Sequence, residues 1–347
     1  MKKKILSVFL SITLLILLTP VNAMAKSDSD NDVITDEVQS FDESKIKFNE
    51  SNPGQPVWLI SHRCNTNVVN ALRRPIAESK SDIQHAIDGG CNGVEVDIRK
   101  STWKPTKGNI ILCHDTGITE RYTETLEQFL SMNVWNQHKI HLVVYDIKEP
   151  EHIDELINVT HKYTQDRNKF DGVYFVYSVG KLDEAKNYFP KNVGKLAPYE
   201  GIEVDMDWNT PAYDVESFYQ SIGFDRCWYG NGIDSFVPFK GFQGGKIERN
   251  CKCAVDIRDG NTTFGPNPKI KKVESWSINR QSAVLEMIGN WKLNALLVGG
   301  KISYKRIKVK SNNTKVPLAS VLLSEINKQH PDRQVYLANG NNNPFMK

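Results

Sequence analysis

The chain has 347 residues, of which 44 are basic, 41 are acidic and 39% are hydrophobic. Three of the basic residues are Lys2, Lys3 and Lys4, and without them the chain carries 41 basic against 41 acidic residues. This balance gives no support for a nucleic-acid partner, which a strongly basic surface would indicate.

The first 25 residues have the pattern of a secretory signal peptide. The three lysines precede an apolar run over residues 5–18, and Ala23-Met24-Ala25 is a small-x-small cleavage site. We therefore expect a secreted protein without a transmembrane segment after cleavage, although an uncleaved membrane anchor is the alternative. Residues 26–55 are polar, rich in Asp and Ser and without an apolar period, which predicts a flexible leader.

Residues 56–347 are predicted to form one domain, which we expect to be monomeric. Six cysteines in an exported chain could form up to three disulfides. One group lies in or beside predicted strands and is as readily explained as buried free thiols: Cys64, Cys91 and Cys113. A second group flanks a Gly-rich loop and predicts one bridge: Cys227, Cys251 and Cys253. No histidine accompanies Cys251 and Cys253 at ligand spacing, which disfavours zinc.

Short apolar runs recur along the domain and are mostly separated by segments of helical character. The predicted strands are 57–61, 93–98, 140–147, 172–178, 202–208, 225–229, 273–279 and 295–300. The predicted helices are 79–87, 152–163, 181–188, 215–222 and 282–288. Eight strands alternating with helices are typical of an α/β fold of the closed (β/α)8 TIM-barrel type.

Two segments interrupt this rhythm. The run 109–114 follows the second strand after only ten residues that include Pro105 and Gly108, so it is expected to return antiparallel as an extra hairpin. The hairpin would bring His114 over the barrel mouth. Residues 230–272 are rich in Gly, Phe and Lys and weakly periodic, which predicts a long functional or disordered loop.

Titratable residues gather at the ends of these strands. Glu95 and Asp97 are two apart, so both carboxylates lie on one face of a strand, and Asp146 and Lys148 repeat the pattern. Charged groups inside a barrel are costly unless paired or bound to a cation. Three convergent carboxylates therefore suggest a divalent ion that prefers oxygen ligands, although Asp146 and Lys148 could form a structural ion pair instead.

In this order the motifs resemble the glycerophosphodiester phosphodiesterase superfamily, and within it the sphingomyelinase D type of phospholipase D found in spider venoms, some actinobacteria and fungi. The resemblance runs from about Val57 to the C-terminus. It implies that His62 and His114 are catalytic and that Lys148 contacts the phosphate. It also implies that Mg²⁺ is bound by the three carboxylates, Glu95, Asp97 and Asp146.

Two further parts of the chain are similar to this subgroup. Trp276 resembles the family tryptophan beside a choline headgroup, with plain core packing as the alternative, and Asp205 lies near the family's substrate-site acid. The ending 337–345 resembles the Ala-Thr-x-x-Asp-Asn-Pro-Trp tail that plugs the far end of the barrel. Glu274, on the same strand face as Trp276, stands where venom members often have a tyrosine.

The departures favour the bacterial and fungal branch. Residues 115–118 replace the cysteine-bounded loop of the venom enzymes, and no Pro-Glu-Asn-Thr follows His62 as in ordinary glycerophosphodiesterases. The implied function is cleavage of the headgroup-side phosphodiester of sphingomyelin and lysophospholipids at a membrane surface, through a cyclic phosphate. His62 is assigned as base or nucleophile and His114 as acid, in either order. A glycerophosphodiesterase for water-soluble diesters and an inactive lipid-binding module are the alternatives, and the sequence leaves open whether the protein acts as a toxin.

Overall fold

The structure is a computed structural model, and it describes residues 33–43, 46, 54–65, 80–117, 120, 123–207, 210–232 and 242–346. The predicted signal peptide lies outside these residues, as does much of the predicted leader. A compact unit begins at Ile34. None of the described helices is both long enough and apolar enough to cross a bilayer.

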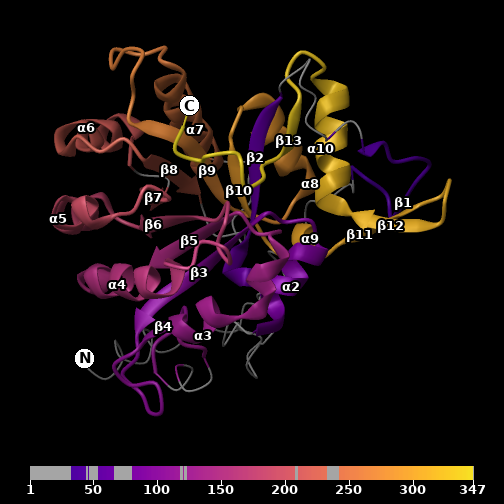
Figure 1. The fold of residues 1–347 in the computed structure, drawn as a ribbon. Helices are drawn as coiled ribbons and strands as arrows, with labels where there is room; N and C mark the ends of the chain where they lie inside the picture. The colour runs from indigo at the N-terminus through magenta and orange to yellow at the C-terminus, as the bar shows by residue number, and fades with distance from the viewer. Residues whose placement is uncertain are drawn as a thin grey trace, which may run out of the picture. The chain divides into compact units, whose positions relative to one another are not determined.

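Eight parallel strands close into a barrel in the described part of the chain (Figure 1). Each strand pairs with the next in chain order, and the last, β10, pairs with the first, β2, so that segments from opposite ends of the domain lie side by side. In order around the barrel the strands are β2 (Gln55–Ser61), β3 (Gly93–Lys100), β5 (Leu142–Ile147), β6 (Tyr174–Val179), β7 (Glu200–Asp207), β8 (Cys227–Gly232), β9 (Ile270–Ile278) and β10 (Ala295–Val298).

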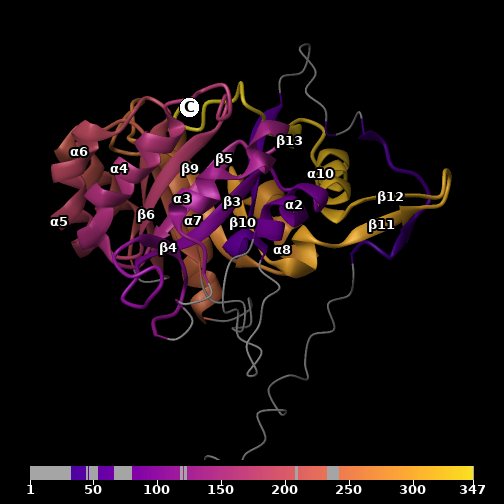
Figure 2. The same ribbon diagram turned by 60° about the horizontal axis from the view of Figure 1, so that its bottom comes forward.

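Helices pack on the outside of this barrel (Figure 2). In α4 the buried positions Ile153, Leu156, Ile157 and Thr160 follow the spacing of one helix face, which explains why the segment folds as a helix against the strands. The helices are α2 (Lys80–Asp88), α3 (Leu126–Ser131), α4 (Ile153–Thr164), α5 (Leu182–Asn192), α6 (Ala212–Ile222), α7 (Phe242–Asp259), α8 (Gln281–Val284), α9 (Gly300–Ser303) and α10 (Leu318–Gln329).

This architecture confirms the predicted (β/α)8 fold, and all eight predicted strands overlap strands of the barrel. The extra hairpin is confirmed as well, because β4 (Ile110–Leu112) pairs antiparallel with β3, with Ile98 opposite Leu112. The hairpin therefore returns the chain toward the mouth of the barrel, at the carboxyl ends of the parallel strands.

The prediction of a long loop over 230–272 is wrong for much of that segment. Residues Phe242–Asp259 form α7, an 18-residue helix. Its buried positions Ile247, Cys251, Ala254 and Arg258 have helical spacing, but small and charged residues at these positions weaken the apolar period in the sequence.

The predicted disulfide is also wrong, because all six cysteines are free thiols. Cys251 and Cys253 lie two residues apart on α7, so their side chains point in different directions, and Cys251 is buried. Cys227 is buried on β8, where its thiol lies 3.3 Å from the Phe224 carbonyl oxygen. These cysteines pack as small apolar side chains.

Part of the predicted leader has regular structure. Strand β1 (Glu37–Val38) pairs in parallel with β11 (Arg306–Val309), which in turn pairs with β12 (Thr314–Pro317). The backbone N–H of Ile34 donates to Gln281 Oε1 at 2.9 Å. The polar composition of residues 26–55 therefore did not show that Glu37–Val38 forms an edge strand on the distant hairpin of β11 and β12.

The floor of the barrel is filled by the C-terminal tail, as the sequence predicts. Strand β13 (Val335–Leu337) pairs with the start of β2, and the chain then crosses below the strands to the buried ring of Phe345. Trp228 Nε1 donates to the Pro344 carbonyl oxygen at 3.0 Å. A Cβ at Gly201 would lie 2.3 Å from Phe345 Cε1, so a glycine is needed where the ring meets β7.

The barrel closes at a narrow seam between β2 and β3. Only two residue pairs join these strands in register, Ile60 with Gly93 and Ser61 with Val94. Just below them the buried side chain of Asn92 accepts from the Leu59 N–H at 2.8 Å and donates to two carbonyl oxygens, Val57 at 3.1 Å and Ala338 at 2.8 Å. One amide therefore links β2, β3 and the tail.

Asn92→Ala should destabilise the protein by about 3 kcal/mol, because it leaves the Leu59 N–H and the Ala338 carbonyl buried without their partner. Urea unfolding followed by tryptophan fluorescence measures this change. The exposed Asn168 offers the matched control, since Asn168→Ala should change stability by less than about 0.5 kcal/mol. Equal stability of the two variants would contradict the role of Asn92 in closing the seam.

Candidate active site

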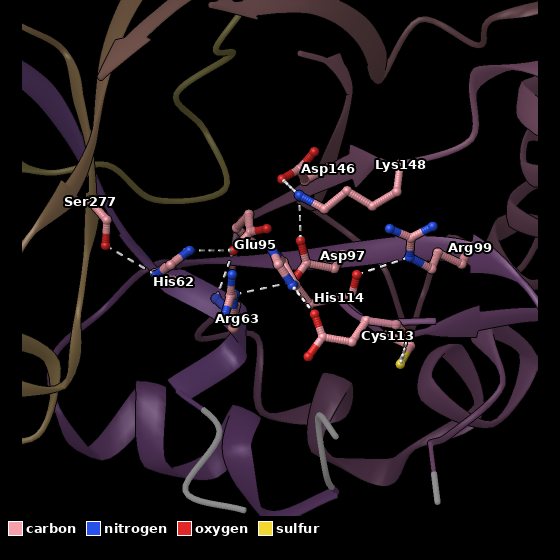
Figure 3. Close-up of polar contacts among 11 residues, drawn as sticks. His62, Arg63, Glu95, Asp97, Arg99, Cys113, His114, Asp146, Lys148 and Ser277 are labelled. Atoms are coloured by element: carbon pink, nitrogen blue, oxygen red, sulfur yellow. Dashed lines mark hydrogen bonds and ion pairs between the residues drawn. The ribbon is translucent and has the colours of Figure 1, made fainter. Parts of the chain in front are cut away.

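The chain turns sharply where β2 reaches the mouth of the barrel. His62 follows the last strand residue, and Arg63 (φ 51°) and Cys64 (φ 48°) adopt the left-handed conformation within the turn His62–Asn65. Non-glycine residues rarely adopt this conformation, so other contacts must stabilise it. One such contact is the Arg63 backbone N–H, which donates to Glu95 Oε2 at 2.6 Å (Figure 3).

Three carboxylates converge beside this turn. Glu95 and Asp97 on β3 and Asp146 on β5 each place a carboxylate oxygen within 4.8 Å of the other two. Glu95 Oε1 is buried and has no hydrogen-bond partner among the described residues. Oxygen ligands at this spacing, one of them unpartnered, fit a hard divalent cation, so the cluster could hold a metal ion.

Two cationic side chains contact the same carboxylates. Lys148 lies 2.8 Å from Asp97 Oδ1 and also bonds to Asp146, and Arg63 Nε lies 3.2 Å from Asp97 Oδ2. Figure 3 shows these side chains directed toward one another. The sequence analysis did not single out Arg63, although its place directly after His62 at a strand end was a usable signal.

The charges at the site shift the pKa values in opposite directions. Burial raises the pKa of Glu95 well above its usual value, and repulsion from Asp97 and Asp146 adds to this. Burial likewise raises the pKa of Asp146, although Lys148 opposes the shift. Burial alone would raise the pKa of Asp97, but Lys148 and Arg63 lower it overall. The negative charge is therefore most stable at Asp97, between the two cations.

His62 is oriented from both sides of its ring. Nδ1 lies 3.1 Å from the Ser277 hydroxyl of β9, and Nε2 faces Glu95 Oε2 at 4.0 Å. Burial and the neighbouring Arg63 lower the pKa of His62 to about 3. The ring therefore favours its neutral form and directs Nε2 toward the carboxylates.

His114 follows β4 on the opposite side of the carboxylates. Arg99 Nε donates to the His114 carbonyl oxygen at 2.9 Å, which ties the residue to β3. The ring Nδ1 lies 2.9 Å from Asp115 Oδ1. Glu120 accepts from the N–H groups of Thr102 at 2.7 Å and Gly117 at 2.9 Å, so one carboxylate organises the chain on both sides of β4.

Trp276 and Asp205 form a pair on the far side of the mouth. Trp276 Nε1 on β9 donates to Asp205 Oδ1 on β7. Between them β8 presents glycines: a Cβ at Gly230 would lie 2.4 Å from Asp205 Oδ1, and one at Gly232 would lie 2.0 Å from the Trp276 carbonyl oxygen. The glycines allow both residues to lie directly against the backbone of β8.

Six of the eight residues predicted for the site lie near or just after the carboxyl ends of strands, and Glu95 and Asp97 lie within β3. The first group surrounds the carboxylate cluster: His62, Glu95, Asp97, His114, Asp146 and Lys148. The second group is the pair Asp205 and Trp276. Their individual roles stay predictions. The residues that the sequence analysis missed are the polar partners Arg63, Asp115 and Ser277. Arg63 and Asp115 directly follow His62 and His114, so adjacency was a usable signal, whereas Ser277 is 215 residues from His62.

A scan against protein-family models finds no match for this chain, and a search of curated proteins finds none either. Among solved structures, the chain is similar to a phosphodiesterase from Oleispira antarctica in complex with the product sn-glycerol-3-phosphate. The two are 14% identical, the match covers 72% of this chain and 93% of the other, and the TM-score is 0.44. A structural match at this identity and TM-score does not show that the two proteins share an activity. The barrel assignment rests on the strand pairing of this chain.

Gly232→Ala should cost about 1 to 3 kcal/mol of stability and change the fluorescence of Trp276, because the added methyl group would clash with its backbone. Chemical unfolding and the emission spectrum of the folded state measure both effects. Gly245→Ala is the control, since Gly245 is exposed on α7 and a Cβ added there would meet no other part of the protein within 4 Å. A Gly232→Ala variant as stable as this control would contradict the packing described for β8.

Proposed function

We propose that the protein is a secreted, Mg²⁺-dependent phosphodiesterase of the phospholipase D or sphingomyelinase D type. Its substrates would be sphingomyelin and lysophospholipids at a membrane surface, cleaved at the headgroup-side phosphodiester. One observation carries the proposal: His62 and His114 approach a carboxylate cluster that also contacts Lys148 and Arg63. Phosphodiester cleavage needs these components, namely a base, an acid and positive charge beside the phosphate.

The positive charge comes from the chain itself and from the ion. Lys148 is held by Asp97 and Asp146 and remains 22% exposed, so it can reach a phosphate oxygen at the mouth. Arg63 extends over Asp97 from the other side. A Mg²⁺ ion bound by Glu95, Asp97 and Asp146 would supply further compensation for the charge on the phosphate. These three residues fit that ion because their oxygens converge.

The surroundings of the two histidines favour different proton roles. Asp115 accepts a hydrogen bond from His114 Nδ1 and so orients the ring, and His114 is assigned as the acid that protonates the leaving oxygen. His62 is hydrogen-bonded to neutral Ser277 and lies beside the cationic Arg63, which favours the neutral ring of a base. If the base acts on a hydroxyl of the lipid, the products are a cyclic phosphate and the free headgroup alcohol.

The same residues would also serve a glycerophosphodiesterase that acts on water-soluble diesters. Phosphorus NMR of reactions with sphingomyelin, lysophosphatidylcholine and glycerophosphocholine separates the two enzymes, because it reports substrate and product together. Cleavage of the lipids to a cyclic or monoester phosphate supports the proposal. Cleavage of glycerophosphocholine alone supports the alternative, and no cleavage of any diester supports a binding module.

Removal of the ion should abolish turnover, and Glu95→Gln should weaken Mg²⁺ binding at least tenfold. The variant loses one negative charge but keeps an oxygen that can accept from the Arg63 N–H. Stability should therefore change by less than about 1 kcal/mol. Isothermal titration calorimetry measures the affinity, with Glu155→Gln at a partly exposed ion pair with Lys100, outside the site, as control. Equal Mg²⁺ affinity in the two variants would argue against the assigned ligands.

His62→Ala and His114→Ala should each lower kcat by about a hundredfold or more. The double variant should lose much less than the product of the two factors, because paired proton carriers act as one unit. Steady-state assays with the lipid found to be cleaved measure the losses. His138→Ala is the control, since His138 is exposed in a loop and is outside the site. A mild loss at either catalytic position would refute its role.

A further inference from the structure

The connection between β3 and β4 carries an exposed tryptophan. Residues 102–107 of this connection are called the hairpin tip here. Trp103 keeps 37% of its surface exposed, and in the described part of the chain the other exposed large hydrophobic side chains are Val33, Tyr213 and Met346. A tryptophan in a folded protein is usually largely buried, so an exposed ring on a loop is a candidate contact with a partner.

The hairpin tip lies outside the mouth of the barrel. The last residue pair between β3 and β4 joins Lys100 to Ile110, so the chain between them extends beyond the carboxyl end of β3 (Figure 1). After β4 the chain returns to His114 at the candidate site. Trp103 is therefore displayed at the end of the barrel where the proposed substrate would enter.

Hydrogen bonds fix the shape of this connection. The Gly108 N–H donates to the Ser101 carbonyl oxygen at 2.8 Å. The Asn109 N–H donates to the Thr106 carbonyl oxygen at 2.9 Å, and the Trp103 N–H donates to the Ser101 hydroxyl at 3.3 Å. The backbone is thus already ordered with Trp103 exposed, so a contact made through the tip costs little conformational entropy.

A buried carboxylate joins the hairpin tip to the segment that follows His114. Glu120 is 2% exposed and accepts from the N–H groups of Thr102 at 2.7 Å and Gly117 at 2.9 Å. Gly117 follows His114 by three residues. A contact at the tip therefore acts on the same unit of structure that carries the proposed acid.

The outer surface of the hairpin tip is positively charged. Lys104 and Lys107 are both exposed, and neither forms an ion pair within the described residues. Glu120, the acid that hydrogen-bonds to the tip, is buried and directs its oxygens to backbone N–H groups. The exposed part of the tip therefore combines one aromatic ring with two cationic side chains.

This combination fits the surface of an anionic phospholipid bilayer. Tryptophan is favoured at the level of the lipid headgroups, where its ring is buried and its N–H still meets polar groups. Lysine side chains beside it are attracted to the negative potential of such a membrane. A stable protein interface buries about 800 Å² per partner, which is more than six residues around a single aromatic ring supply.

We propose that the hairpin tip docks the protein on anionic phospholipid membranes. Trp103 inserts among the headgroups, and Lys104 and Lys107 lie against lipid phosphates. This inference rests on the proposed function and names the surface that brings the mouth of the barrel to its lipid substrate.

Vesicle sedimentation in the presence of a chelator measures docking without turnover. The wild type should bind vesicles of phosphatidylcholine mixed with phosphatidylglycerol about tenfold more tightly than vesicles of phosphatidylcholine alone. Trp103→Ala and the double variant Lys104→Gln/Lys107→Gln should each lower binding to the mixed vesicles about tenfold. A wild type that binds neither kind of vesicle would overturn the inference and leave the tip to a protein partner.

Exposed side chains at the opposite end of the barrel provide matched controls. Met346→Ala removes an exposed apolar side chain at the floor. The double variant Lys139→Gln/Lys191→Gln removes two exposed lysines, one just before β5 and one in the last turn of α5. Both controls should bind mixed vesicles as the wild type does. Equal binding by the tip variants and these controls would overturn the inference.

Vesicles with brominated acyl chains test the position of the ring. They should quench part of the tryptophan fluorescence of the wild type, and Trp103→Phe should remove most of this quenching while it keeps an aromatic ring at the tip. Quenching of equal size in the two proteins would contradict insertion of Trp103.

The docking surface and the proposed function fail in different ways. Binding of mixed vesicles through the tip without cleavage of any lipid diester would refute the proposed function and support the docking surface. Cleavage of vesicle lipids together with unchanged vesicle binding in both tip variants would overturn the docking surface and leave the proposed function intact.

Discussion

Closure of the barrel at the seam between β2 and β3 is the constraint on which the site depends. His62 leaves β2 on one side of this seam, and Glu95 and Asp97 lie on β3 on the other. Two residue pairs and the side chain of Asn92 hold the strands together, with the tail completing the lower part of β2. Because the Arg63 N–H donates to Glu95 across this seam, its closure also sets the position of the turn that carries His62.

The two ends of the barrel have opposite compositions for a physical reason. The mouth holds carboxylates that burial makes costly, so it cannot contribute much to stability in the absence of cations. The floor compensates with large apolar groups, among them Trp58, Trp228 and the Phe345 ring from the tail. The rings of Trp58 and Trp228 meet edge to face with centroids 5.8 Å apart, a favourable aromatic geometry. Stability and chemistry therefore lie at different ends of the same strands.

Apolar and alternating runs were enough to predict the strands and the convergence of Glu95, Asp97 and Asp146, because acids on the inner face of parallel strands come close together. The roles of the site residues came from the family resemblance and stay predictions. It could not predict the partners that orient them. Ser277 and His62 are 215 residues apart, and nothing local in the sequence connects them. The disulfide prediction was wrong for a related reason. The sequence around Cys251 and Cys253 does not show whether they flank a loop or lie on a helix, and the burial of Cys251 on α7 becomes clear only from the structure.

Segments with weak apolar periods were the least predictable part of the fold. Helix α7 is buried through Cys251 and Ala254, whose small side chains give a weak sequence signal but allow close packing against β8 and β9. Strand β1 has only two residues and is defined by its pairing with β11, near the other end of the chain. In both cases tertiary contact decides the structure, and local propensity does not.

Because side chains alternate between the two faces of a strand, a single strand places different residue types at different depths inside the barrel. On β9 the inward residues change from Lys272 at the floor, through Glu274, to Trp276 at the mouth, so one strand contributes a tail contact, an acid and an aromatic ring. The proposed catalytic groups come from β2 to β5, whereas the hydrogen-bonded pair Asp205 and Trp276 comes from β7 and β9. Strand β9 connects the two sides of the barrel, because Ser277 directly follows Trp276 and contacts His62.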